Sequence, residues 1–187
     1  MPRQGLEIRE AHPEDAPDLV ELWSQAGHGT VQPPQLAAEA PTALAHIAAD
    51  PDERLMVGMH EDKVVASLHL RRGPISPLHT EQVVHTSFLL VLPEFRRHGY
   101  AQALMDSAVT WAEEKGVDHV TAITVSSSRD ANRYLARLGL ATAATVRMAS
   151  TGTVRKKLSP ERRVHGSRRH VGQVLAQRRT MRRRQTD

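Results

Sequence analysis

The stretch VLPEFRRHGYAQALM, residues 91–105, decides how the chain is interpreted. An apolar run ends at a proline, a basic loop with a glycine follows, and a helical pattern then begins. The first N–H groups of a helix have no partner within the helix and carry the positive end of its dipole. Glycine lets a ligand approach the backbone closely, and arginine offers forked donors to phosphate oxygens. The loop therefore predicts a phosphate-binding site, and the alternative is a solvated basic turn.

Other phosphate loops and several kinds of site are excluded by the sequence. It contains neither GxxxxGK[ST] nor a GxGxxG that opens a βαβ unit. The absence of cysteine excludes disulfides, thiolate nucleophiles and cysteine-ligated zinc. The histidines show no metal-ligand spacing, so we predict no metal site.

Length and hydropathy bound the class of protein. The chain has 187 residues, which is enough for one domain with its own core and an appendage. The first residues lack the apolar core of a signal peptide, and the longest apolar run, FLLVL, is too short to cross a bilayer. We therefore expect a cytoplasmic protein without a transmembrane segment.

The positive charge of the chain is concentrated at its end. Residues 159–187 hold nine arginines against Glu161 and Asp187, a net charge of +7. Because the whole chain carries +4, residues 1–158 carry −3. Three interpretations of the tail remain open: a disordered basic tail, a helix that packs on the body or on a second subunit in a homodimer, and an electrostatic arm for RNA or an anionic membrane.

Periodicity and turn residues predict a mixed α/β fold, in which helices flank a central mixed β-sheet. The expected elements, in chain order, are a strand at 6–10, helices at 14–26 and 41–50, a hairpin at 54–70 that turns at Glu61–Asp62, a strand at 81–93, a helix at 99–115, a strand at 118–125, a helix at 126–140, and a final pair of strands at 141–150 and 153–158. We predict a domain at 1–158 and an arginine-rich tail at 159–187.

The loop and the strand before it resemble the acetyl-CoA-binding motif of the GNAT N-acetyltransferase family. The pattern L-x-V-x-P, then R-x-x-G-x-A, is present from Leu89 to Ala101. The element order and the late helix that ends in Leu-Gly-Leu also match this family, over about residues 5–158. The resemblance implies the GNAT fold and acetyl-CoA as co-substrate.

The resemblance also implies binding roles. In the family, amides of the loop and of the first helical turn bind the pyrophosphate of coenzyme A, and the free backbone of the preceding strand pairs with the pantetheine arm. The implied pyrophosphate-binding residues are Arg96, Arg97, His98, Gly99, Tyr100 and Ala101. The implied pantetheine-binding residues are Leu89, Leu90 and Val91.

Catalytic residues are less clearly indicated. In many family members a tyrosine on the late helix protonates the leaving thiolate, but the corresponding residue is Leu135. Tyr134 is adjacent, and it is either the acid or a residue that packs or lines the substrate site, since one helical step rotates a side chain by about 100°. His85 is a candidate base, on the predicted face of Ser87, Leu89 and Val91. The alternatives are a structural histidine at 85, or Glu81 acting through water.

The implied activity is transfer of an acetyl group from acetyl-CoA to a primary amine, by direct attack in a ternary complex. The acceptor is not identified by the sequence; we expect it to contact residues 27–40, 41–50 and 71–82. Two alternatives belong to other classes: a non-catalytic module that binds coenzyme A, and a nucleic-acid-associated protein that acts through its basic tail.

Overall fold

The structure is a computed structural model, and it describes residues 6–26, 33–125 and 127–158. Its contacts divide the chain into two units, residues 1–142 and residues 143–187. The arginine-rich tail at 159–187, with its three interpretations, lies outside the described residues. The domain boundary at residue 158 therefore stays a prediction.

A five-stranded sheet forms the centre of the first unit, and its strands are ordered as in the sequence. Pairing is antiparallel between the first four strands and parallel between the last two, so the sheet is mixed, as predicted. The tight turn at Glu61 and Asp62 is also confirmed, and Glu61 has a φ of 54°. The strands are β1 (Glu7–Glu10), β2 (Glu53–His60), β3 (Lys63–Pro74), β4 (Gln82–Val91) and β5 (Val120–Ala122).

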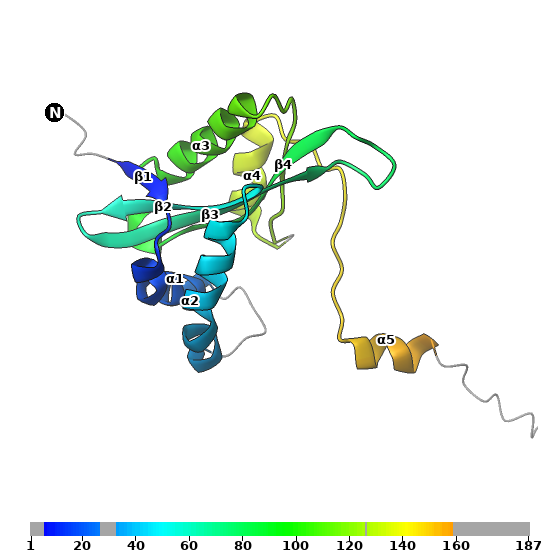
Figure 1. Cartoon of the computed structure of the whole chain (residues 1–187), viewed down its shortest axis with the longest axis horizontal. Coiled ribbons are helices and arrows are strands. Elements are labelled where there is room, and N and C mark those ends of the chain that lie inside the picture. The colour runs from blue at the N-terminus through cyan, green and yellow to red at the C-terminus, as the bar shows by residue number, and fades with distance from the viewer. Residues whose placement is uncertain (1–5, 27–32, 126, 159–187) are drawn as a thin grey trace, which may run out of the picture. The chain divides into compact units, whose positions relative to one another are not determined.

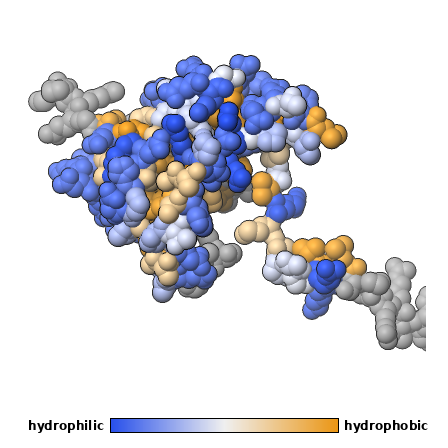
Figure 2. Space-filling view, in the orientation of Figure 1, coloured by the Kyte–Doolittle hydropathy of each residue, from blue (hydrophilic) through white to orange (hydrophobic). Residues whose placement is uncertain are grey.

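Helices cover both faces of this sheet (Figure 1). On one face, α1 (Ala16–Ala26) and α2 (Pro33–Ala49) pack on β2 and β3, while α3 (Tyr100–Glu114) covers the other. The shorter α4 (Arg129–Arg137) follows β5, and 3₁₀ turns precede α1 and α3 at Pro13–Asp15 and Pro93–Phe95. Apolar side chains between the layers, such as Leu68 and Leu104 at 0% exposure, form the core. The visible outer surface is mostly hydrophilic (Figure 2).

An ion pair fixes the turn from β1 into α1. Arg9 donates from both terminal nitrogens to the Asp15 carboxylate at 2.7 and 2.8 Å, and the His12 N–H donates to the same carboxylate at 2.7 Å. Burial opposes the charge on Asp15, but these hydrogen bonds prevail and lower the pKa of its carboxyl. The brace holds α1 against the sheet.

The second helix is longer than the sequence pattern indicated. A helix starting with Pro41 was expected, but α2 begins at Pro33 and has Pro41 inside it. This prediction was wrong because residues 35–40, QLAAEA, favour a helix strongly enough to extend it, and Pro33 stands where a missing N–H costs nothing. A Gln35–Glu39 hydrogen bond of 2.8 Å supports the added turn.

The predicted final pair of strands is also wrong. Residues 143–150 form no regular structure, and α5 (Thr151–Leu158) is a helix. Its β-branched residues suggested a strand, but Ser150 accepts a hydrogen bond from the Thr153 N–H at 3.2 Å and so caps a helix start. Arg155, Lys156 and Lys157 in the last turn complement the helix dipole.

Candidate active site

Strands β4 and β5 part within the sheet. Their pairing covers Val84, His85 and Thr86 of β4, and it ends with a hydrogen bond from the Ile123 N–H to the Thr86 carbonyl at 2.8 Å. β4 nevertheless continues to Val91. The Leu92 N–H donates to the Val65 carbonyl of β3, so the alternate N–H, that of Val91, faces the opposite, open edge. The described structure thus contains an open backbone edge at the end of β4.

A β-bulge interrupts β4 at this place. Ser87 pairs with His69 and Leu90 pairs with Ser67, so two residues of β4, Phe88 and Leu89, lie opposite one residue of β3. Phe88 has a φ of 53°, in the left-handed region. The extra residue changes the alternation of faces.

The bulge corrects one prediction about His85. His85 and Ser87 are paired with Arg71 and His69, on the face that α1 and α2 cover, and beyond the bulge Leu90 shares this face. Val91 pairs with Ala66 on the other face. The expectation that His85 shares a face with Ser87 is confirmed, but the expectation that it shares this face with Val91 was wrong, because it assumed unbroken alternation.

The basic loop leads directly into α3. Gly99 stands at the N-cap with a φ of +98°, where only glycine is unstrained, and a Cβ there would lie 3.2 Å from the Leu6 side chain. The first helical bond runs from the Ala103 N–H to the Gly99 carbonyl, so the preceding amides of the first turn have no partner within the helix. Ala101 belongs to this first turn. These donors fit a pyrophosphate group.

The loop side chains divide between solvent and core. Arg96, Arg97 and His98 are exposed, and the Arg96 guanidinium makes only a long contact, 3.4 Å, to the Val91 carbonyl. Tyr100, in contrast, is 4% exposed and its hydroxyl donates to the Met59 carbonyl at 3.0 Å. Burial raises the pKa of Tyr100. Tyr100 can therefore offer a ligand its backbone N–H, while its side chain anchors α3 to β2.

Helix α4 places Tyr134 against the core. Leu135, the residue at the usual tyrosine position, is buried at 8% exposure, and Tyr134 is partly buried beside the core cluster. The Tyr134 hydroxyl oxygen is buried and has no hydrogen-bond partner among the described residues. Burial raises the pKa of Tyr134, and the nearby charge of Arg137 opposes this. A protonated hydroxyl without a protein partner suits a proton donor.

Polar side chains gather on the α1 and α2 face, before the bulge. His85 Nδ1 lies 2.9 Å from the Thr121 hydroxyl of β5. His69, which the sequence analysis did not single out, bonds to Glu53 at 2.6 Å and to Ser87 at 3.0 Å. The alternation of polar residues at 67, 69 and 71 with leucines at 68 and 70 is the signal that could have revealed His69.

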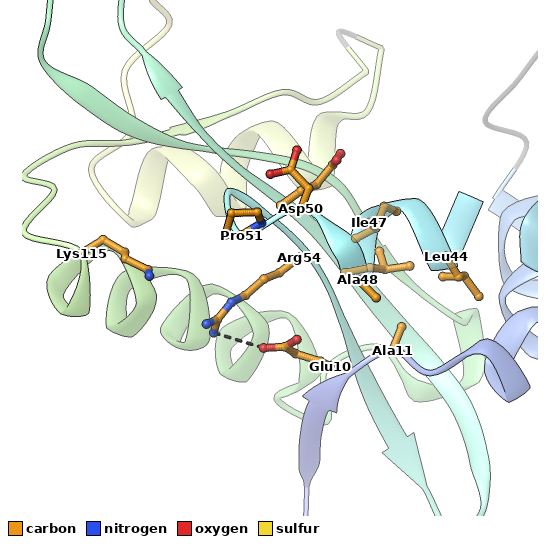
Figure 3. Close-up of a pocket in the computed structure, with 11 residues that line it drawn as sticks. Glu10, Ala11, Leu44, Ile47, Ala48, Asp50, Pro51, Arg54 and Lys115 are labelled. Carbon is orange, nitrogen blue, oxygen red and sulfur yellow. Dashed lines mark ion pairs between the residues drawn. The ribbon is translucent and has the colours of Figure 1, made fainter. Parts of the chain in front are cut away.

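A separate cavity of about 230 Å³ lies between α2, the strands β1 and β2, and the end of α3 (Figure 3). Arg54 and Glu10 form an ion pair of 3.2 Å at its wall, and Arg54 also lies over the Trp111 ring. None of the predicted coenzyme-binding residues lines this cavity. It is therefore distinct from the open edge of β4.

The described part of the chain also bears on metal binding and on membrane insertion. There, histidine, aspartate and glutamate residues form no group of three or more suited to hold a metal ion. Within those same ranges, no helix combines the length and the apolar character needed to cross a membrane.

Comparisons with known proteins agree with this geometry. Residues 16–140 match the acetyltransferase (GNAT) family. A transcriptional regulator from Bacillus halodurans is 20% identical with a TM-score of 0.70, over 78% of this chain and 100% of that one. Glucosamine-6-phosphate N-acetyltransferase from Arabidopsis thaliana is 15% identical with a TM-score of 0.62, over 79% and 98% of the two chains. Aminoglycoside N-acetyltransferase AAC(6')-Iy, solved in complex with CoA, is 17% identical with a TM-score of 0.65, over 80% and 97%. No curated protein sequence matches significantly.

The family match covers more than half of the chain, and the mixed sheet with its flanking helices has the fold of these solved structures. The predicted fold and family are confirmed. This chain belongs to the acetyltransferase (GNAT) family, and it is an acyl-CoA-dependent N-acetyltransferase with acetyl-CoA as co-substrate.

Proposed function

We propose that the enzyme acetylates a primary amine, which attacks the thioester of acetyl-CoA directly while both substrates are bound. The parting of β4 from β5 just before the N-terminus of α3 carries this proposal. Within the implied segment of Leu89, Leu90 and Val91, the backbone groups that face away from β3, such as the Val91 N–H, would pair with the pantetheine arm. The loop amides from Arg96 to Ala101 would bind the pyrophosphate, with the Arg96 guanidinium adding charge.

Two protons must be handled in this reaction. Tyr134 is the proposed donor to the departing thiolate, since its hydroxyl is buried, protonated and without a partner among the described residues. His85 is the candidate base from the sequence, and its Nδ1 is already bonded to Thr121. The acceptor surface is proposed to include α2 and residues 71–82. A cytoplasmic location remains part of this proposal.

Calorimetry of acetyl-CoA binding tests the proposal with two matched glycine variants. Gly99 and Gly116 have φ values of +98° and +64° at the two ends of α3, so alanine strains the backbone at both. Gly116→Ala has open space around it and should lose about 1 kcal/mol of stability with an unchanged Kd. Gly99→Ala should lose a similar stability and raise the Kd about tenfold or more, since the donors of the loop shift.

Equal Kd values for the wild type and both variants would show that the loop does not bind the coenzyme. The absence of acetyl-CoA binding by the wild type would contradict the proposal as a whole. Retained binding without thiol release, for every amine tried, would leave the non-catalytic alternative as the better account.

A further inference from the structure

Three side chains form a continuous hydrogen-bonded chain across β2, β3 and β4, which are neighbouring strands of the sheet. Glu53 on β2 bonds to Nε2 of His69 on β3 at 2.6 Å, and Nδ1 of the same ring bonds to the Ser87 hydroxyl on β4 at 3.0 Å. The Glu53 and His69 side chains are only 20% and 19% exposed. The arrangement places a carboxylate, an imidazole and a hydroxyl in series.

The carboxylate decides which nitrogen of His69 carries the proton. An ionised Glu53 can only accept, so Nε2 of the neutral ring is the N–H that donates to it. Nδ1 then has a free lone pair and accepts the proton of the Ser87 hydroxyl. Ser87 is thus held by a base whose charged form Glu53 would stabilise, as in hydrolases that use Ser, His and an acid.

The position of Ser87 connects this chain to the proposed reaction. Ser87 is the residue immediately before the bulge, and the pairing of β4 with β5 ends at Thr86. The backbone that would hold the pantetheine arm begins two residues later, so the thioester end of the arm would lie next to Ser87. His85, on the same face, is bonded to the neutral hydroxyl of Thr121, and no carboxylate bonds to it in the described residues.

The charged groups around His69 are few. On the same face, Arg71 of β3 lies opposite Glu53 of β2 and His85 of β4 in the strand register. Asp50, just after α2, lines the same cavity as Glu53. The acids of α1 are engaged elsewhere, at the β2–β3 turn: Asp18 accepts from the Val64 N–H and Glu21 accepts from Lys63. Glu53 is therefore the charge in direct contact with the ring.

We propose that Ser87 is the catalytic residue that takes a proton from the acceptor ammonium, with His69 and Glu53 as its positioning residues. This inference rests on the proposed function. The first ammonium proton moves to Ser87 Oγ while the Ser87 proton moves to His69 Nδ1. The amine nitrogen bonds to the thioester carbon and the C–S bond breaks. The second ammonium proton replaces the proton that Tyr134, the proposed donor, gives to the departing thiolate. The third stays on the amide nitrogen, and His69 returns its proton to water.

Two amines of different basicity test this relay without knowledge of the natural acceptor. n-Butylamine is protonated at neutral pH and needs a base before it can attack, whereas hydroxylamine is largely unprotonated and does not. Thiol release from acetyl-CoA is measured with each amine, for the wild type and for Ser87→Ala and His69→Gln. Ser67→Ala is the matched control, since its hydroxyl is buried on the same face without a partner among the described residues.

With n-butylamine, Ser87→Ala and His69→Gln should lower kcat about 100-fold. With hydroxylamine the loss should stay below about threefold, because no proton has to be removed before attack. The acetyl-CoA Kd should remain within about twofold. Glutamine can still bond to Ser87 but cannot take its proton, so His69→Gln should show the loss with n-butylamine even though a hydrogen bond is kept. Ser67→Ala should behave as the wild type.

Equal losses with both amines would overturn the relay and leave the three residues as a structural brace. A selective loss with n-butylamine in His85→Gln, and not in Ser87→Ala, would assign the base to His85 instead. If the wild type binds acetyl-CoA but accelerates thiol release with neither amine, the relay is wrong while coenzyme binding stands. If acetyl-CoA does not bind at all, the proposed function fails and the relay fails with it.

Discussion

The two ends of β4, separated by the bulge at Phe88, are built from different chemistry. Before the bulge, side chains bond to side chains: His85 to Thr121 at 2.9 Å and Ser87 to His69 at 3.0 Å. After it, the side chains are apolar, and what the strand offers is the backbone N–H of Val91 at the open edge.

The two ends of β4 should therefore tolerate different substitutions. The end after the bulge should accept changes of side chain as long as the backbone stays in place. The end before it should lose function when the Ser87 hydroxyl, or the His69 nitrogen bonded to it, is removed. Tyr134 on α4 and Tyr100 on α3 belong to neither end of β4, and substitutions at both provide a reference for this difference.

The largest effect is expected for Tyr134→Phe, because no side chain of β4 after the bulge could protonate the thiolate in its place. We expect kcat to fall about 100-fold with an unchanged acetyl-CoA Kd. Because burial raises the pKa of Tyr134, the wild-type donor stays protonated, so kcat should show no alkaline loss below about pH 10. Steady-state kinetics from pH 6 to 10, with n-butylamine as acceptor, measure both.

The stability of Tyr134→Phe provides the internal control. The hydroxyl has no partner among the described residues, so its removal should leave the melting temperature unchanged or slightly raised. A clear loss of stability would mean that the hydroxyl is bonded within the folded protein, and the kinetic loss would then have a structural cause.

A smaller effect is expected for Val91→Pro, which removes one backbone N–H at the open edge. Proline is tolerated where the N–H is outside the ladder, so the fold should persist. The acetyl-CoA Kd should rise about tenfold, the value of one lost hydrogen bond. Val91→Ala, which keeps the N–H, should bind within about twofold of the wild type by calorimetry. If both variants bound equally, the backbone at Val91 would not hold the pantetheine arm.

Tyr100→Phe should affect stability and not binding. Its hydroxyl donates to the Met59 carbonyl at 3.0 Å inside the core, so the free energy of unfolding should fall by about 1 kcal/mol. The loop amides remain, and the acetyl-CoA Kd should stay within about twofold. Urea unfolding and calorimetry on the same preparation separate the two quantities. A Kd that rises tenfold would show that the hydroxyl, and not only the amide, takes part in binding.

Local sequence signals predicted the parts of the site that depend on single residues. Pro93 ends the strand, Gly99 permits the positive φ at the start of α3, and Glu61 with Asp62 closes the hairpin. Each of these features follows from the conformational limits of a residue and its neighbours. For this reason the loop and the central strand are recognisable from the sequence.

Features set by long-range pairing could not be predicted in this way. The bulge at Phe88 exists because β3 offers one residue opposite two of β4, and nothing in the local pattern reveals that register. The bond from His69 to Glu53 joins residues 16 positions apart, and its bond to Ser87 joins residues 18 apart. The extended α2 and the helical α5 also differ from expectation, because short propensity patterns were outweighed by neighbouring residues and a serine cap.

The smallest effect is expected for Thr121→Val, which removes the hydroxyl bonded to His85 Nδ1. Under the Ser87 relay, His85 is a spectator, and kcat with n-butylamine should stay within about twofold of the wild type. If His85 were the base, loss of the hydroxyl that fixes its ring should lower kcat about tenfold. If His85 is the base, Thr121→Ser, which keeps a hydroxyl, should have the kcat of the wild type in the same measurement. Thr121 is bonded to His85 but is not part of the Ser87 relay. The two Thr121 variants therefore decide whether His69 or His85 takes the proton.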